Sequence, residues 1–298
     1  MPLRHDMRRG ALLMLGATAC FAVMGVFVKV LSARYSFLEL MFFRNGFSMP
    51  IVLAAGLRTG ALLRTRKLGG HAVRALSGMV GMGCAFFALT LLPLADQTAL
   101  NYTQPLFIIL LAIPWLGERP SPMRWAAVVT GFLGVLVIAA GQGAGSGTGG
   151  AGVSDSRLLG YAVAALGGFF GGLSTMLVRQ LSATEPSTTI VLWQALLMTA
   201  MTGLTLPFVW ITPGWVDLGL LVLMGLIGGV GQVLNTEAFA SAQVSSLGPY
   251  TYTGLLWAGL LGWMVWGETP GVAMLAGSAL IVGAGFLVLR GEFRRRPK

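Results

Sequence analysis

The chain has 298 residues, of which 55% are hydrophobic and only 10% are charged. A soluble protein carries about 25% charged residues, so this composition excludes a soluble globular protein and favours one surrounded by membrane lipid. The net charge of +10 does not indicate a nucleic-acid partner, because the basic residues lie in short clusters between apolar runs.

The apolar runs predict the elements. A helix needs roughly 20 apolar residues to cross a bilayer, and runs near this length recur along the whole chain. They are continuous rather than alternating, which excludes membrane-spanning strands. We therefore predict an all-α membrane protein with ten transmembrane helices. The predicted spans are residues 11–31, 38–57, 72–92, 97–116, 124–140, 158–178, 188–208, 216–240, 244–266 and 271–290.

Lysine and arginine indicate the orientation of these spans. With the N-terminus inside, only Arg34 and Arg157 fall in outer loops, and Lys29 and Arg44 lie within spans. All other lysines and arginines then face the cytoplasm, as the positive-inside rule requires. We expect a multi-pass protein of the bacterial inner membrane with both termini in the cytoplasm.

An internal repeat divides the chain. VKVLSA at 28–33 recurs as VRQLSA at 178–183, and Glu118 recurs as Glu268, each time 150 residues later. Five spans is an odd number, so the second copy must cross the membrane in the opposite sense. Such inverted repeats are typical of secondary transporters. The predicted parts are a first repeat of spans one to five (1–140), a Gly/Ser-rich periplasmic linker (141–156), and a second repeat with a basic cytoplasmic tail (157–298).

Several motifs carry a family resemblance. They are ELMFFRNG at 39–46, LPLADQTALNYTQPLF at 92–107, and PYTYTGLLWAGLLGWMVWGETP at 249–270. With the paired GERP and GETP, they resemble the drug/metabolite transporter superfamily, in its ten-span branch with two EamA domains. The resemblance implies a carrier of amino acids or other metabolites, or of nucleotide-like molecules such as S-adenosylmethionine. It does not identify the substrate.

Charged residues near span ends allow two interpretations. An ionisable side chain at the bilayer centre costs about 2.5–3.5 kcal/mol on insertion scales, so each needs a partner or a wet cavity. Lys29, Glu39 and Arg44 form either a charged rim for an anionic solute group or a structural ion pair between spans one and two. We interpret Glu118 and Glu268 as structural helix ends. A carboxylate is unfavourable at a helix C-terminus, so basic or backbone donors of adjoining spans must hold them.

Polar and amphipathic faces indicate the candidate binding site. Gln97, Asn101 and Gln104 recur at i, i+4 and i+7, a spacing that places them on one helix face. Exposure of these polar side chains to lipid would cost free energy, whereas exposure to a water-filled cavity would not. Pro105 and Pro249 either open the backbone there or make a simple kink. The candidate substrate-binding residues are Met79, Met82, Phe86, Gln97, Asn101, Tyr102, Gln104, Gln232, Asn235, Glu237, Tyr250, Thr253 and Trp257.

Catalysis has little support in the sequence. The only histidines, His5 and His71, lie outside the predicted spans, and no metalloprotease, nucleotide-binding or serine-hydrolase motif occurs. We expect no catalytic residue, metal or cofactor. The predicted function is export of small metabolites, first of all amino acids, including those with aromatic or large apolar side chains, by alternating access through a central cavity between the inverted repeats. The alternatives are uptake or exchange of S-adenosylmethionine and, less favoured, a membrane scaffold without transport. A monomer suffices for a pathway enclosed by the two repeats.

Overall fold

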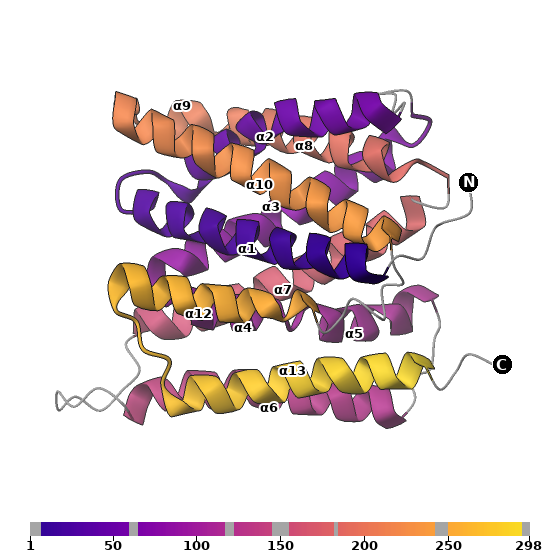
Figure 1. Cartoon of the computed structure of the whole chain (residues 1–298), viewed down its shortest axis with the longest axis vertical. Coiled ribbons are helices and arrows are strands. Elements are labelled where there is room, and N and C mark those ends of the chain that lie inside the picture. Colours follow the sequence, from indigo (N-terminus) through magenta and orange to yellow (C-terminus); the bar gives the residue numbers. More distant parts are fainter. Residues whose placement is uncertain are drawn as a thin grey trace.

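The computed structural model describes residues 7–59, 65–116, 122–144, 155–181, 184–241 and 250–293. The regular elements in these ranges are all helices, which confirms the predicted all-α fold (Figure 1). They are α1 (Met7–Leu31), α2 (Phe37–Thr59), α3 (Leu68–Leu91), α4 (Leu94–Asn101), α5 (Gln104–Leu116), α6 (Pro122–Ala144), α7 (Asp155–Leu181), α8 (Ser187–Gly203), α9 (Leu206–Val209), α10 (Trp215–Ser241), α12 (Thr253–Trp266) and α13 (Val272–Phe293).

The helices have the length and surface of membrane spans. Within the described ranges, five stretches are long and apolar enough to cross a bilayer, and they lie in α1, α2, α3, α7 and α10. Shorter apolar stretches lie in α6, α8, α12 and α13. Large apolar side chains stay on the outside, such as Trp215 at 90% and Leu57 at 80% exposure. A surface of this kind suits lipid rather than water. The total of ten spans stays a prediction.

The helices lie side by side in one bundle, and α1 begins on the same side of it as α13 ends (Figure 1). Each helix of one predicted repeat packs against a helix of the other, and the same pairing occurs twice with the roles of the repeats reversed. Helix α1 packs on α10, while α7, the equivalent of α1, packs on α3, the equivalent of α10. The largest buried cluster includes Val28, Met41 and Met224, so α1, α2 and α10 share one core.

Helices α6 and α13 approach each other through small residues, and they lie together at the bottom of Figure 1. A Cβ added to Gly134 would lie 2.6 Å from the carbonyl oxygen of Gly277, and one added to Gly277 would lie 2.5 Å from that of Gly134. Ala127 and Ala284 are also fully buried, in one cluster. We call these four residues the small-residue seam. Close backbone approach of this kind holds helices together in lipid.

The predicted span at 97–116 is wrong as a single helix. The chain forms α4 and α5 instead, with a turn at Tyr102 and Thr103 whose N–H groups donate to Ala99 and Leu100 at 3.1 and 3.0 Å. Pro105 has no N–H for the carbonyl four residues earlier, and proline is tolerated in the first turn of a helix. Helix α12 likewise begins after a turn at Tyr252, 150 residues after Tyr102. Pro249 lies outside the described residues.

Candidate functional site

The two helix breaks meet inside the bundle. The rings of Tyr102 and Tyr252 contact each other with centroids 5.0 Å apart. The Tyr102 hydroxyl donates to the Thr251 carbonyl at 2.7 Å, so one break is bonded to the other. Beside them, the hydroxyls of Thr18 and Thr253 lie 3.0 Å apart and join α1 to α12. Non-helical backbone at this depth is typical of a substrate pathway in transporters.

A cavity of about 450 Å³ lies next to these breaks, between α1, α3 and α4. Its size falls in the range of roughly 300–1,000 Å³ that small-molecule sites occupy. We call it the central cavity. It is lined by Thr18, Phe21, Ala22, Met24, Gly25, Met82, Ala85, Phe86, Leu89, Leu94, Gln97, Thr98, Asn101, Tyr102, Gln104, Thr251 and Gly254.

The walls of the central cavity differ in chemistry. Helices α1 and α3 contribute aromatic and thioether side chains, among them Phe21, Met24 and Phe86. Such side chains form an apolar surface that adapts to ligands of varied shape. Helix α4 contributes the amides of Gln97 and Asn101. Gln97 is 4% exposed, whereas Asn101 is exposed although it ends a helix in the middle of a predicted span. The arrangement can bind a molecule that has a ring at one end and hydrogen-bonding groups at the other.

Six of the predicted substrate-binding residues line this cavity: Met82, Phe86, Gln97, Asn101, Tyr102 and Gln104. The sequence analysis missed the whole contribution of α1. Its Thr18, Phe21, Ala22 and Gly25 have the i, i+3, i+4, i+7 spacing of one helix face. The signal was a threonine and a glycine on one face of an otherwise apolar helix.

Other predicted residues lie elsewhere. Met79 packs against the largest buried cluster, and Tyr250 packs beside Met14. Thr253 bonds Thr18 at the edge of the central cavity. Trp257 is 37% exposed on α12 and is not among the residues that line the central cavity. The half-buried Gln232 and Asn235 of α10 also do not line it.

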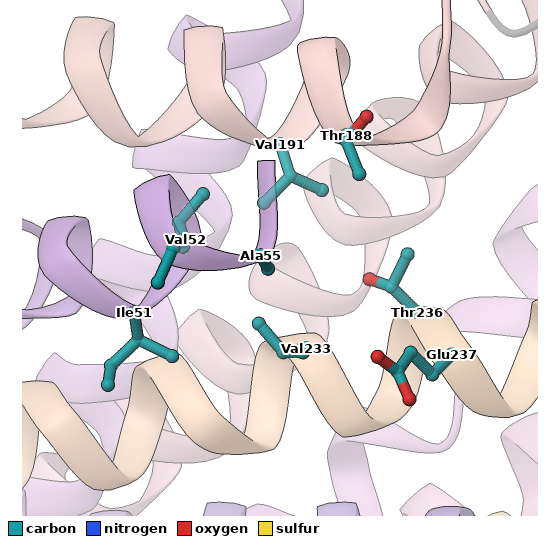
Figure 2. Close-up of a pocket in the computed structure, with 9 residues that line it drawn as sticks. Ile51, Val52, Ala55, Thr188, Val191, Val233, Thr236 and Glu237 are labelled. Carbon is teal, nitrogen blue, oxygen red and sulfur yellow. The ribbon is translucent and has the colours of Figure 1, made fainter. Parts of the chain in front are cut away.

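Glu237 belongs to a second, smaller cavity of about 320 Å³ between α2, α8 and α10. Figure 2 shows Thr188, Thr236 and Glu237 toward one end of it, and the apolar Ile51 and Val52 toward the other. Glu237 is one turn from the end of α10, its side chain is 51% exposed, and it lies 3.8 Å from Arg9. Glu237 therefore lines a different cavity from the amides of α4.

The predicted ion pair between spans one and two is wrong. Lys29 instead forms an ion pair with Glu268, which lies 239 residues away beyond the end of α12. The Leu94 N–H in the first turn of α4 also donates to this carboxylate, at 3.2 Å. Glu268 thus has both a basic and a backbone partner, and it lies at a helix N-terminus, where a negative charge is favourable. Its equivalent, Glu118, lies outside the described residues.

The position of Glu268 follows from how α12 ends. Gly267 takes a left-handed conformation with φ of 67°, which favours glycine over residues with a side chain. Its N–H donates to the Trp263 carbonyl at 2.9 Å, and the Glu268 N–H donates to that of Gly262 at 3.2 Å. This termination turns Glu268 back toward α1. The Lys29 ammonium also lies over the Trp266 ring, 4.8 Å from its centroid.

Glu39 and Arg44 have separate surroundings. Glu39 lies in the first turn of α2, is fully buried, and accepts the Ile211 N–H at 3.3 Å through one carboxylate oxygen. Arg44 donates from Nη1 to the Asn45 Oδ1 atom at 3.0 Å. The three charges of the predicted rim, Lys29, Glu39 and Arg44, therefore have separate partners and do not form one rim.

A further polar cluster ties the connection between α1 and α2 to α10. The Arg34 guanidinium lies 3.1 Å from Asp217, and the Tyr35 hydroxyl donates to the same carboxylate at 2.8 Å. Burial raises the pKa of the Tyr35 phenol, and its bond to the Asp217 carboxylate acts in the same direction. The cluster closes the loop over the start of α10.

The central cavity has the lining of a small-molecule binding site. Among the described residues, no three His, Cys, Asp or Glu side chains are close enough together to hold a metal ion. A many-helix membrane fold with a cavity beside two broken helices defines a carrier of small molecules. The chain belongs to the EamA-like transporter family, whose model matches residues 8–140 and 158–290. It is a multi-pass membrane transporter of the drug/metabolite transporter superfamily and not an enzyme.

Named relatives cover nearly the whole chain. A riboflavin transporter of Rhizobium johnstonii is 31% identical over 97% of this chain and 93% of its own length. The pseudopaline exporter CntI of Pseudomonas aeruginosa is 30% identical over 93% of this chain and 95% of its own length. An S-adenosylmethionine uptake transporter of Rickettsia felis is 26% identical over 90% of this chain and 87% of its own length. A solved crystal structure, 22% identical, superposes with a TM-score of 0.65 over 97% of this chain and 99% of its own, and it supports the fold alone.

Proposed function

We propose that the chain is a secondary transporter that exports small amphipathic metabolites through the central cavity. Amino acids with aromatic or large apolar side chains are the first candidates. The observation that carries the proposal is the contrast between the cavity walls. A ring would lie against Phe21 and Phe86, while Gln97 and Asn101 would bind the polar end. Apolar pockets with a few well-placed polar groups are the usual form of a small-molecule site.

Alternating access is the mechanism that suits this fold. The meeting of the two helix breaks at Tyr102 and Tyr252 supports it, because broken helices let each half change shape around one site. In this proposal, repeats 1–140 and 157–298 are joined by the periplasmic linker 141–156. Both termini are in the cytoplasm, the membrane is the bacterial inner membrane, and a monomer suffices.

Riboflavin is a second candidate substrate. Its support comes from the relative that is 31% identical over 97% of this chain and is named a riboflavin transporter. A flat ring system would also suit the aromatic wall of the central cavity. Uptake or exchange of S-adenosylmethionine is the third candidate, supported by a more distant relative at 26% identity. The central cavity argues against a scaffold without transport, which would need no such space.

Transport by the purified chain in proteoliposomes tests the proposal. Labelled phenylalanine should cross faster than in empty liposomes, and unlabelled riboflavin and S-adenosylmethionine should compete weakly. Gln97→Leu removes a buried amide of the cavity and should weaken apparent affinity by roughly tenfold, the effect of about 1.4 kcal/mol. Gln180→Leu is the matched control, because Gln180 lies on an exposed face of α7. Phenylalanine flux equal to that of empty liposomes would reject amino-acid transport, and the other two labelled compounds would then decide between the remaining candidates.

A further inference from the structure

Arg44 is a buried cation with no counter-ion among the residues that the structure describes. Its side chain is 8% exposed within α2. The ion pairs of the described residues join other partners, and no carboxylate among those residues lies within 4.0 Å of the Arg44 guanidinium. A charge at this depth is costly unless something compensates it. A bound ligand can supply the negative charge that no described carboxylate supplies to Arg44.

The free edge of Arg44 has the shape that a carboxylate needs. Nη1 is used, because it donates to the Asn45 Oδ1 atom at 3.0 Å. Nε is buried and has no partner, and Nη2 has no hydrogen bond to a described residue. These two nitrogens form one edge of the planar guanidinium. Such an edge binds both oxygens of a carboxylate with two parallel hydrogen bonds.

Arg44 itself is not among the residues that line the central cavity, but two methionines that do line it lie near Arg44 and Asn45. A Cβ added to Gly228 of α10 would lie 2.8 Å from the Met24 sulfur and 3.3 Å from Arg44 Nε, so both atoms lie against the same glycine. On the other side, Asn45 Nδ2 lies 3.9 Å from the Met82 sulfur. Met24 and Met82 line the central cavity. Methionine is unbranched and changes rotamer easily, so in the inference that follows, rotamer changes of these two side chains would connect Arg44 with the cavity.

We propose that Arg44 is the carboxylate-binding residue of the central cavity, which selects substrates with an anionic end. The inference rests on the proposed function and narrows its substrate class. Asn45 orients the guanidinium, and its amide is itself fixed by a bond to the Met41 carbonyl at 2.8 Å. The charge is present in only one repeat, because the equivalent of Arg44 is Gln194, whose Nε2 would lie 3.3 Å from a Cβ added to Gly78. The anionic end of the substrate therefore binds on the side of the first repeat.

A pair of matched ligands tests this inference. Phenylacetate and phenylacetamide have nearly the same shape, but only the first is an anion. Binding is measured as thermal stabilisation of the purified protein in detergent, and again as inhibition of phenylalanine flux in proteoliposomes. We expect the wild type to prefer phenylacetate by roughly 10- to 100-fold, the effect of hydrogen bonds to a charged group. Arg44→Gln, which introduces the side chain of the second repeat, should abolish the preference.

The variants separate a binding role from a structural one. Arg74→Gln is the matched control, since Arg74 is another arginine at 6% exposure with a buried Nε that has no partner among the described residues. It donates to the Ile190 carbonyl of α8 at 3.2 Å, whereas Arg44 lies against the same glycine as the cavity-lining Met24. Arg74→Gln should keep the preference. Arg44→Lys retains the positive charge but lacks the two-nitrogen edge of the guanidinium, so it should show an intermediate preference for phenylacetate. This variant also provides the test if Arg44→Gln does not fold.

Two results would overturn the inference: a wild type that binds both ligands equally, or an Arg44→Gln variant that still prefers phenylacetate. Failure of the proposed function has a different outcome. A wild type that prefers phenylacetate in the thermal measurement but does not carry phenylalanine would reject amino-acid transport and support the anion site.

Discussion

At the scale of single residues, Glu268 shows why a rare acid ends an apolar helix. One carboxylate joins Lys29 of α1, the first turn of α4 and the end of α12. The sequence predicted that Glu268 needs basic or backbone donors, because that follows from local helix chemistry. The identity of the donors could not be predicted. Lys29 seemed nearest to Glu39 along the chain, and only the packing of α1 against α12 brings Glu268 closer.

The Lys29–Glu268 pair should contribute measurably to stability. Both side chains are mostly buried, at 16% and 23% exposure. A double-mutant cycle with Lys29→Met and Glu268→Gln should give a coupling energy of roughly 0.5–3 kcal/mol, measured by thermal unfolding in detergent. The Arg34–Asp217 pair is the control, because Arg34 is 71% exposed and such pairs contribute about 0–1 kcal/mol. Additive effects at Lys29 and Glu268 would contradict this assignment.

At the scale of elements, the sequence predicted most helices but left open whether Pro105 breaks its helix or only kinks it. Spans such as 11–31 and 216–240 lie within α1 and α10, because long apolar runs admit few alternatives in lipid. The break at Tyr102 was harder to predict, since a proline is compatible with either a kink or a turn. The choice depends on tertiary contacts, among them the bond from Tyr102 to Thr251 in the other repeat.

The small-residue seam should be sensitive to a single methyl group. Gly277→Ala would place Cβ 2.5 Å from the Gly134 carbonyl oxygen, and we expect a loss of about 1–3 kcal/mol because α6 and α13 must separate. Gly283→Ala on the same helix has nothing within 4 Å of the added atom. It should be neutral or stabilising by up to about 1 kcal/mol, because alanine favours a helix more than glycine does. Melting temperatures of the two variants in detergent measure the difference, and equal values would count against the seam.

At the scale of the whole molecule, composition and the 150-residue repeat were enough to predict a helical membrane transporter. The substrate region was predicted less completely, because α1 contributes an apolar face that resembles a lipid-facing surface in sequence. The residues Thr18, Met24 and Gly25 acquire their role only when α1 packs beside α3 and α4.

Orientation in the membrane can be tested directly. Gly69→Cys in α3 and Gly214→Cys just before α10 both place a side chain where no other atom lies within 4 Å. The background needs Cys20→Ala and Cys84→Ala, which remove the two native thiols. A membrane-impermeant maleimide applied to intact cells should label position 214 and not 69. Labelling of both positions would show that they share a side and would contradict the predicted crossing of the two repeats.

The seam also limits which movements the carrier can make. The backbones at Gly134 and Gly277 approach each other closely, and the Ile138 and Ile281 side chains pack against the same two glycines. Sliding of α6 along α13 would therefore bring these tightly packed groups into collision. We therefore expect α6 and α13 to act as a fixed pivot during the transport cycle. The helices around the central cavity would then rotate about α6 and α13 as rigid bodies. The largest displacements would occur in the helices farthest from this pair, which are α2, α8 and α10.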